Sequence, residues 1–182
     1  ALTAHEVDID PRLLFYPSEA FAQSYNNCSS AEMREKQRDW VRLYKEEGYT
    51  VDAAYVMTAF GCNLEGPIPQ ERILADFSFI LQLCGEENIP VPSLVVADTM
   101  GWGNPEAVKR MIGALRELAP EARIGMHIHD TRGLGIANVY AALSMGVDMF
   151  ESSVAGLGGC PFAGHGHARA AGNVCTEDAV FL

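Results

Sequence analysis

Short apolar segments alternate with longer amphipathic segments along most of the 182-residue chain, and this alternation constrains the fold more than any other feature. The apolar segments are short enough to be β-strands and contain many β-branched or bulky residues. The segments between them repeat apolar residues at the spacing of an α-helix. We therefore predict a succession of strands and helices, with five strands at residues 13–16, 51–58, 94–97, 124–129 and 149–154.

Signals for helix ends bound the amphipathic segments. Ser29 and Glu32 have the spacing of a capping box, at the start of a helix that should end before Gly48. The other predicted helices have weaker signals. They begin near Pro69 with an expected end at Gly85, begin after Asn104, cover residues 134–145, and begin at Thr176.

Strands that alternate with helices and have short connections form parallel sheets, either an open doubly wound sheet or a closed (β/α)8 barrel. No GxGxxG turn follows an early strand, as a dinucleotide-binding sheet would require. Polar residues instead follow several strands, which is typical of a barrel. We therefore predict an α/β fold of the TIM-barrel type. Five strands cannot close a barrel, so residues 1–182 are expected to form the C-terminal part of one catalytic domain, without its first strands and its C-terminal end.

Composition excludes several classes of function. A net charge of −11 argues against binding to nucleic acid, and no apolar segment has the length needed to span a membrane. The five cysteines are scattered and include no CxxC pair, which favours free thiols in a reducing compartment such as the cytoplasm or the mitochondrial matrix. An anionic substrate would need a local cationic patch.

His127 and His129 lie two residues apart in the fourth predicted strand. Alternate residues of a strand face the same side, so both imidazoles should point into the barrel, where they could hold one metal ion. The alternative is a hydrogen-bonded pair of histidines without a metal.

Three more residues have side chains suited to chemistry. Cys160 follows three glycines after the fifth strand and could transfer a proton, or it could be a structural thiol. The amide oxygen of Asn173 suits Mg²⁺ or Mn²⁺, although an isolated asparagine after glycine is more often a turn or cap residue. Asp98 ends the third strand and could orient a substrate, shuttle a proton or cap a turn.

Together these segments resemble the 3-hydroxy-3-methylglutaryl-CoA lyase family over nearly the whole chain. The resemblance is carried by HIHDTRGLGIAN at residues 127–138, ESSVAGLGGCPFA at 151–163, SEAFAQSYNNCS at 18–29, AFGCNLEGPI at 59–68 and ADTMGWGNPE at 97–106. The GGCP sequence is the most discriminating part, because synthases and the pyruvate carboxylase transferase domain of the same superfamily share the HxH strand but lack it.

The resemblance implies a carbon–carbon lyase that binds a divalent cation, Mg²⁺ or Mn²⁺, and cleaves a 3-hydroxy-acyl-CoA to acetyl-CoA and a keto acid. The expected substrate is 3-hydroxy-3-methylglutaryl-CoA, in leucine degradation and ketone body metabolism, and the full-length protein is expected to be a homodimer. The implied metal ligands are His127, His129 and Asn173; the implied catalytic residues are Cys160 and Asp98; and the implied substrate-binding residues are Ser18, Thr99 and Arg132.

The sequence departs from the family pattern in several places. The segment that carries the family's aspartate ligand and adjacent arginine has no counterpart here. The stretch from Cys160 to Asn173 is longer than expected and contains His165 and His167, which we expect to face solvent. Arg132 stands where the family commonly has an aromatic residue. Two alternatives therefore stay open: a condensing synthase of the same superfamily, and an inactive truncated homologue.

Overall fold

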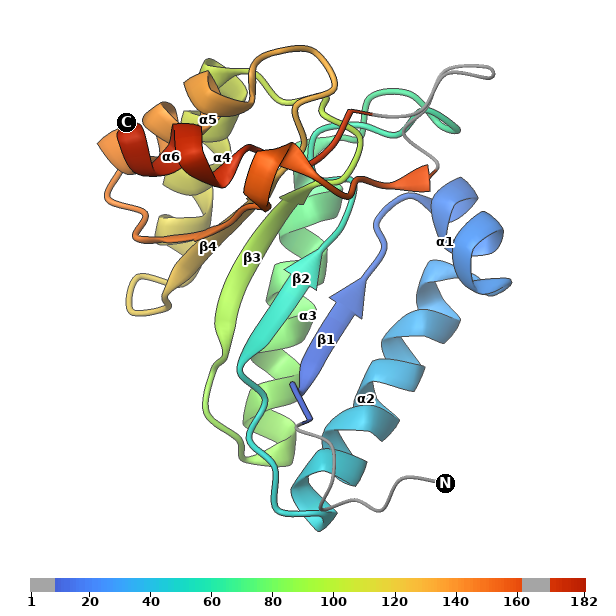
Figure 1. Cartoon of the computed structure of the whole chain (residues 1–182). Helices are drawn as coiled ribbons and strands as arrows, with labels where there is room; N and C mark the ends of the chain where they lie inside the picture. Colours follow the sequence, from blue (N-terminus) through green and yellow to red (C-terminus); the bar gives the residue numbers. More distant parts are fainter. Residues whose placement is uncertain (1–8, 162–170) are drawn as a thin grey trace, which may run out of the picture.

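The structure is a computed structural model that describes residues 9–161 and 171–182. Its five strands form one parallel sheet in the order β1-β2-β3-β4-β5. The helices between them are shown in Figure 1. The strands are β1 Arg12–Phe15, β2 Ala53–Val56, β3 Ser93–Asp98, β4 Ile124–Ile128 and β5 Met149–Glu151. The helices are α1 Glu19–Asn26, α2 Ser30–Glu46, α3 Gln70–Glu87, α4 Pro105–Leu118, α5 Gly135–Ser144 and α6 Thr176–Phe181, with a short 3-10 turn, η1, at Val154–Gly156.

The strand order decides between the two folds that the sequence left open. In a doubly wound sheet the order reverses at a switch point, whereas the strands of a barrel follow one another in sequence. Here every strand pairs with its neighbour in the chain, beginning with Arg12 beside Ala53 and continuing to His127 beside Glu151. The sheet is therefore arranged as a part of a (β/α)8 barrel, as predicted.

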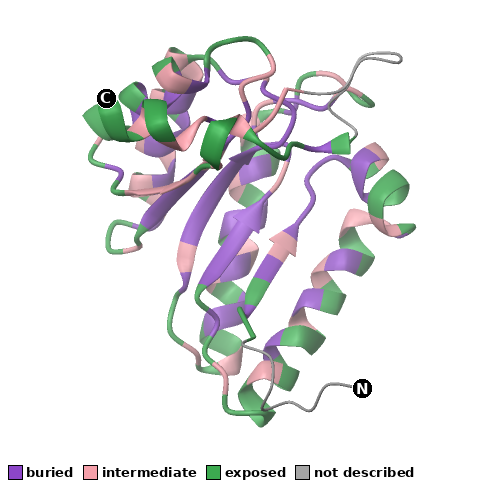
Figure 2. Ribbon diagram, viewed as in Figure 1, coloured by how far each residue is buried: buried purple, intermediate pink, exposed green. Residues whose placement is uncertain are grey.

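The main hydrophobic core lies between the sheet and the helices that cover its outer side, and Figure 2 shows β2, β3 and β4 as mostly buried. It includes Leu13, Phe77, Val96 and Met126. The opposite, inner side of the sheet has only a small apolar cluster around Tyr55. The inner side is therefore free to carry polar residues, and the site described below uses them.

The helix caps follow the sequence closely at α2. The Ser29 hydroxyl accepts the backbone N–H of Glu32 at 3.1 Å, and the Glu32 carboxylate accepts the backbone N–H of Ser29 at 2.8 Å, so the predicted capping box is confirmed. The predicted end of α3 at Gly85 is wrong. The helix continues to Glu87, and Asn88 ends it in a left-handed conformation that asparagine tolerates.

Helix α1 was not predicted, because its eight residues are too few to establish a helical period in the sequence. The Ser18 hydroxyl accepts the backbone N–H of Phe21 at 3.2 Å and caps this helix. None of the helices in the two described ranges has the combination of length and apolarity that a membrane span requires.

Candidate active site

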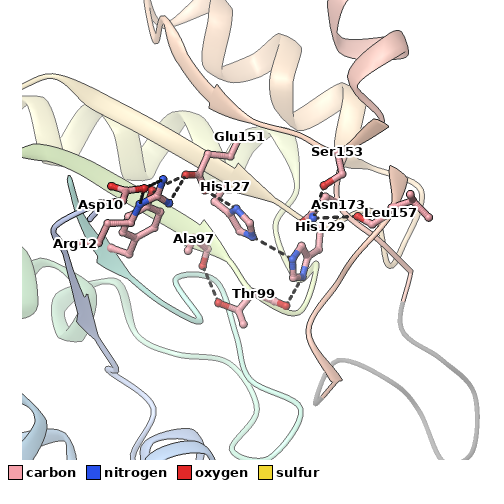
Figure 3. A network of polar contacts seen from close by, with 11 residues as sticks. Asp10, Arg12, Ala97, Thr99, His127, His129, Glu151, Ser153, Leu157 and Asn173 are labelled. Atoms are coloured by element: carbon pink, nitrogen blue, oxygen red, sulfur yellow. Dashed lines mark hydrogen bonds and ion pairs between the residues drawn. The ribbon is translucent and has the colours of Figure 1, made fainter. Parts of the chain in front are cut away.

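Five of the predicted site residues, Thr99 and four with side chains suited to chemistry, line one cavity at the carboxyl ends of the strands. The cavity has a volume of about 260 Å³ and its wall includes His127, His129, Cys160 and Asn173. The remaining lining residues are Phe21, Tyr25, Met57, Thr99, Gly159 and Pro161. The cavity therefore combines two imidazoles, an amide and a thiol with an apolar rim, and Figure 3 shows His127, His129 and Asn173 close together.

Strand parity places the two imidazoles on the inner side of the sheet. Paired residues of parallel strands point to the same side, and Ala97 pairs with His127 while Asp98 pairs with Ile128. Ile128 belongs to the outer core, so His127 and His129 face inward. Their Nε2 atoms lie 3.1 Å apart. The sequence prediction that both rings share one face is confirmed.

Both imidazoles have a hydrogen-bond acceptor at Nδ1. The Nδ1 of His127 lies 2.8 Å from a carboxylate oxygen of Glu151, and the Nδ1 of His129 lies 2.5 Å from the backbone carbonyl of Thr99. A carbonyl oxygen cannot donate, so the Nδ1 of His129 must carry a proton. Burial, followed by the neighbouring His127, lowers the pKa of His129, so this ring is neutral at neutral pH and its Nε2 has a lone pair.

The Glu151 carboxylate is an equally good acceptor for His127. Burial raises the pKa of Glu151, but hydrogen bonds from His127 and Tyr55 and the charge of Arg12 outweigh this and lower it to about 2. The carboxylate is therefore ionised at neutral pH. Glu151 was not among the predicted site residues. Its place opposite His127 in the pairing of β4 with β5 is the feature that reveals it.

Asn173 completes a set of donors that could hold a cation. Its Nδ2 donates to the Ser153 hydroxyl at 2.8 Å and to the Leu157 carbonyl at 3.1 Å. Its Oδ1 is buried and has no hydrogen bond of acceptable geometry. A buried oxygen without a donor, beside two Nε2 atoms that face each other, fits a divalent cation bound by nitrogen and oxygen. Residues 9–161 and 171–182 contain no cluster of three or more His, Cys, Asp or Glu side chains with metal-site geometry, so an amide would be needed.

Two glycines allow the loop of Cys160 to lie against the segment of Asn173. Gly159 has a φ of +117°, which an L side chain rarely adopts. A Cβ on Gly172 would lie 1.6 Å from the carbonyl oxygen of Gly156, so only glycine fits there. These contacts bring Cys160 to the cavity wall, where it is 9% exposed. The histidines at positions 165 and 167 lie outside the described residues.

The other predicted site residues do not line this cavity, with the exception of Thr99. Ser18 is fully buried and donates to the Glu65 carboxylate at 2.8 Å while it caps α1. Arg132 donates to the carbonyls of Met100 and Gly101 and lies 5.0 Å from the Trp102 ring. Their predicted contacts with substrate stay predictions. Thr99 contributes its backbone carbonyl to His129 and its hydroxyl to the backbone N–H of Thr58.

Asp98 is 1% exposed and lies on the outer side of the sheet. Its two carboxylate oxygens accept the backbone N–H groups of Trp102 at 2.8 Å and Gly103 at 2.9 Å. These bonds cap the turn before α4, which was the structural alternative in the sequence. Burial raises the pKa of Asp98 to about 6, although both N–H groups oppose the shift. Its predicted catalytic role stays a prediction.

The raised pKa of Asp98 has a consequence for stability. The folded state binds the proton of Asp98 more tightly than the unfolded state does. Protonated Asp98 therefore adds to the free energy of unfolding at low pH, and this contribution is lost as pH rises through about 6. We expect the difference in unfolding free energy between the wild type and Asp98→Asn to fall by about 3 kcal/mol from low to neutral pH. Urea unfolding of both proteins across this range measures it, and a difference that grows with pH would contradict the assignment.

Comparisons with known proteins agree with this fold. The model of the HMGL-like family matches residues 4–182. The hydroxymethylglutaryl-CoA lyase of Pseudomonas mevalonii is 37% identical over 166 residues, which cover 91% of this chain and 51% of that protein. A 3-hydroxy-3-isohexenylglutaryl-CoA/hydroxymethylglutaryl-CoA lyase of Pseudomonas aeruginosa is 34% identical over 166 residues, with 91% and 51% covered.

Solved structures show the same relationship. An HMG-CoA lyase from Acinetobacter baumannii, in complex with coenzyme A and 3-methylmalate, superimposes with a TM-score of 0.80 at 34% identity. The match covers 93% of this chain and 52% of that one, so the chain spans about half the length of the relatives it matches. It has the sheet and helices of one part of their TIM barrel. The family match over residues 4–182, the identity of these relatives and the shared fold show that this chain belongs to the HMGL-like family.

Proposed function

We propose that this chain carries part of the active site of a metal-dependent acyl-CoA lyase, which cleaves a 3-hydroxy-acyl-CoA into acetyl-CoA and a keto acid. One observation carries the proposal. The Nε2 atoms of His127 and His129 converge at 3.1 Å on the wall of a cavity that Cys160 and Asn173 also line. This is a cation site and a proton donor facing the same space, and the membership of the chain in the HMGL-like family supports the combination.

His127, His129 and Asn173 would hold a divalent cation, for which we propose Mg²⁺ or Mn²⁺. A bound divalent cation supplies a Lewis acid that polarises hydroxyl and carboxylate oxygens of a substrate. The residues of the chain orient the imidazoles: Thr99 and Glu151 accept their Nδ1 protons and leave the Nε2 lone pairs on the cavity side. The apolar side chains of Phe21 and Met57 line the space above them.

The proposed reaction breaks the bond between C2 and C3 of the acyl chain. The 3-hydroxyl gives its proton to water in the cavity, which later returns a proton to the Cys160 thiolate. C3 becomes the keto carbon, and the electrons of the broken bond pass to C2, which becomes the enolate carbon of acetyl-CoA. Cys160 gives its thiol proton to C2 and so completes acetyl-CoA. Its place on the cavity wall, which Cys62 and Cys84 do not line, supports this role.

We propose 3-hydroxy-3-methylglutaryl-CoA as the substrate. The named activities of the Pseudomonas mevalonii and Pseudomonas aeruginosa relatives support it, and the second of these also acts on a longer isohexenyl homologue. The coenzyme A in the Acinetobacter baumannii complex supports an acyl-CoA ligand. An isohexenyl group at C3 would need more room than a methyl group. Comparing the turnover of these two substrates therefore tests the apolar rim of the cavity.

Removal of the cation tests the proposed function directly. Dialysis against EDTA is expected to lower the release of acetyl-CoA from 3-hydroxy-3-methylglutaryl-CoA by roughly 100-fold or more, because Lewis-acid stabilisation contributes several kcal/mol. Addition of Mn²⁺ or Mg²⁺ should restore it, and circular dichroism before and after dialysis controls for unfolding. Turnover that survives EDTA would contradict metal dependence.

The same assay separates the alternatives. A condensing synthase would instead consume acetyl-CoA together with a 2-keto acid, and its turnover would not require the thiol of Cys160. A protein that binds Mn²⁺ but neither cleaves nor condenses would keep the cation site and refute the lyase function for this chain.

A further inference from the structure

A continuous network of polar contacts crosses the inner side of the sheet from β1 to β4 (Figure 3). Arg12 donates through Nη1 to the Tyr55 hydroxyl at 2.6 Å and to Oε1 of Glu151 at 2.9 Å. The Tyr55 hydroxyl donates to the same Oε1 at 2.5 Å. The other oxygen of Glu151, Oε2, accepts the Nδ1 proton of His127 at 2.8 Å. Both oxygens of the Glu151 carboxylate therefore accept hydrogen bonds.

Three residues of this network of contacts do not line the cavity. In the described part of the molecule, the cavity wall contains His127 but not Arg12, Tyr55 or Glu151. Tyr55 is 5% exposed and belongs to the small inner apolar cluster. These three side chains therefore cannot act on a ligand in the cavity by contact, and any effect they have on it passes through the His127 ring.

We propose that Glu151 is a positioning residue that keeps the proton of His127 on Nδ1 and its Nε2 lone pair toward the cavity, and that Arg12 and Tyr55 hold Glu151 in place for this purpose. The proposal rests on the cation site proposed above. A carboxylate that pairs with a guanidinium on one oxygen offers only an acceptor with the other, so it selects one orientation and one protonated nitrogen of the ring.

The substitution Glu151→Gln separates this role from simple packing, because it keeps the shape of the side chain. Arg12 and Tyr55 both donate toward the position of Oε1, so they favour the amide oxygen there. The amide NH₂ then faces Nδ1 of His127, which must become an acceptor, and the ring proton moves to Nε2. The Nε2 lone pair that a cation requires is lost, although the packing around the side chain is nearly unchanged.

The experiment uses the 182-residue chain and two readouts. In the wild type, ¹⁵N NMR of the histidine rings should show a proton on Nδ1 of His127, both without metal and with Zn²⁺ added. Titration with Mn²⁺, followed by the electron paramagnetic resonance of free Mn²⁺, should give a dissociation constant that is about 10–100-fold higher for Glu151→Gln. Glu87→Gln is the matched control. Glu87 ends α3, and its 15% exposed side chain accepts a guanidinium N–H of Arg42 on α2 and does not line the cavity. This substitution should leave the Mn²⁺ affinity unchanged.

The outcomes distinguish this inference from the proposed function. A wild-type His127 without a proton on Nδ1 overturns the inference, and this measurement needs no variant to fold. Equal Mn²⁺ affinity for Glu151→Gln and Glu87→Gln also overturns it. If the wild type binds neither Zn²⁺ nor Mn²⁺, the proposed cation site fails, while the ring of the metal-free protein still shows whether Glu151 sets the proton of His127.

Discussion

Replacing Cys160 with alanine is expected to lower the rate of carbon–carbon cleavage by about two to four orders of magnitude, which is the usual contribution of a positioned general acid. Cys160 lies on the wall of the cavity with His127 and His129, so its proton can reach a carbon that is held there. The loss should appear in kcat, and the affinity for Mn²⁺ should stay unchanged, because the predicted ligands are His127, His129 and Asn173. Release of acetyl-CoA and titration with Mn²⁺ measure the two effects separately.

The matched control is Cys84→Ala. Cys84 is also buried, but it lies on α3 in the outer core and does not line the cavity. Burial raises the pKa of its thiol to about 11, so it is an inert core residue. Its replacement should leave the rate of cleavage unchanged. Equal rates for wild type and Cys160→Ala would remove the proton-transfer role, and an equal loss in both variants would point to stability rather than chemistry.

Replacing Arg34 with methionine is expected to destabilise the fold by about 3–5 kcal/mol at neutral pH, because it leaves a buried carboxylate without its partner. Asp76 is 1% exposed, its Oδ1 accepts from Nε of Arg34 at 2.7 Å, and its Oδ2 has no hydrogen-bond partner. Burial raises the pKa of Asp76 while Arg34 lowers it. Without Arg34 the pKa rises further, so the loss of stability should shrink as falling pH protonates Asp76. Urea unfolding at several pH values measures it.

Arg38→Met is a closely matched control for this prediction. The guanidinium groups of Arg34 and Arg38 both lie 5.6 Å from the ring of Phe79, and both residues are on α2. Arg38 differs in its partner, because the Glu86 side chain is 40% exposed. An exposed ion pair contributes at most about 1 kcal/mol. If both variants lost the same stability, the effect would come from contact with Phe79 and not from the buried charge of Asp76.

Much of the fold followed from local signals. The alternation of strands and helices predicted all five strands and the helices at α2, α3, α4, α5 and α6, because apolar periodicity and capping residues act within a few positions. The error at the end of α3 shows the limit. Gly85 suggested a stop, but its backbone could remain helical, and the asparagine at position 88 adopted the left-handed conformation instead.

The candidate site was predicted less completely. His127, His129, Cys160 and Asn173 were expected to lie together, and the structure brings them to one cavity. Asp98 was predicted to join them because it ends a strand. Its side chain, however, points to the opposite side of the sheet from the neighbouring Thr99, which lines the cavity. The alternation of side chains along a strand is enough to separate these two residues, because neighbours in a strand face opposite sides of the sheet.

The sequence by itself determined the succession of elements, the capping of α2 and the residue types that can bind a cation or transfer a proton. Only the tertiary structure decided which of those residues meet. The Nδ1 partner of His127 is 24 positions away in Glu151, and the Arg12 that holds Glu151 is 139 positions away. These contacts depend on the register of neighbouring strands and on side chains that cross the inner side of the sheet. No local pattern encodes them, because the energy that selects them arises only when the whole sheet has formed.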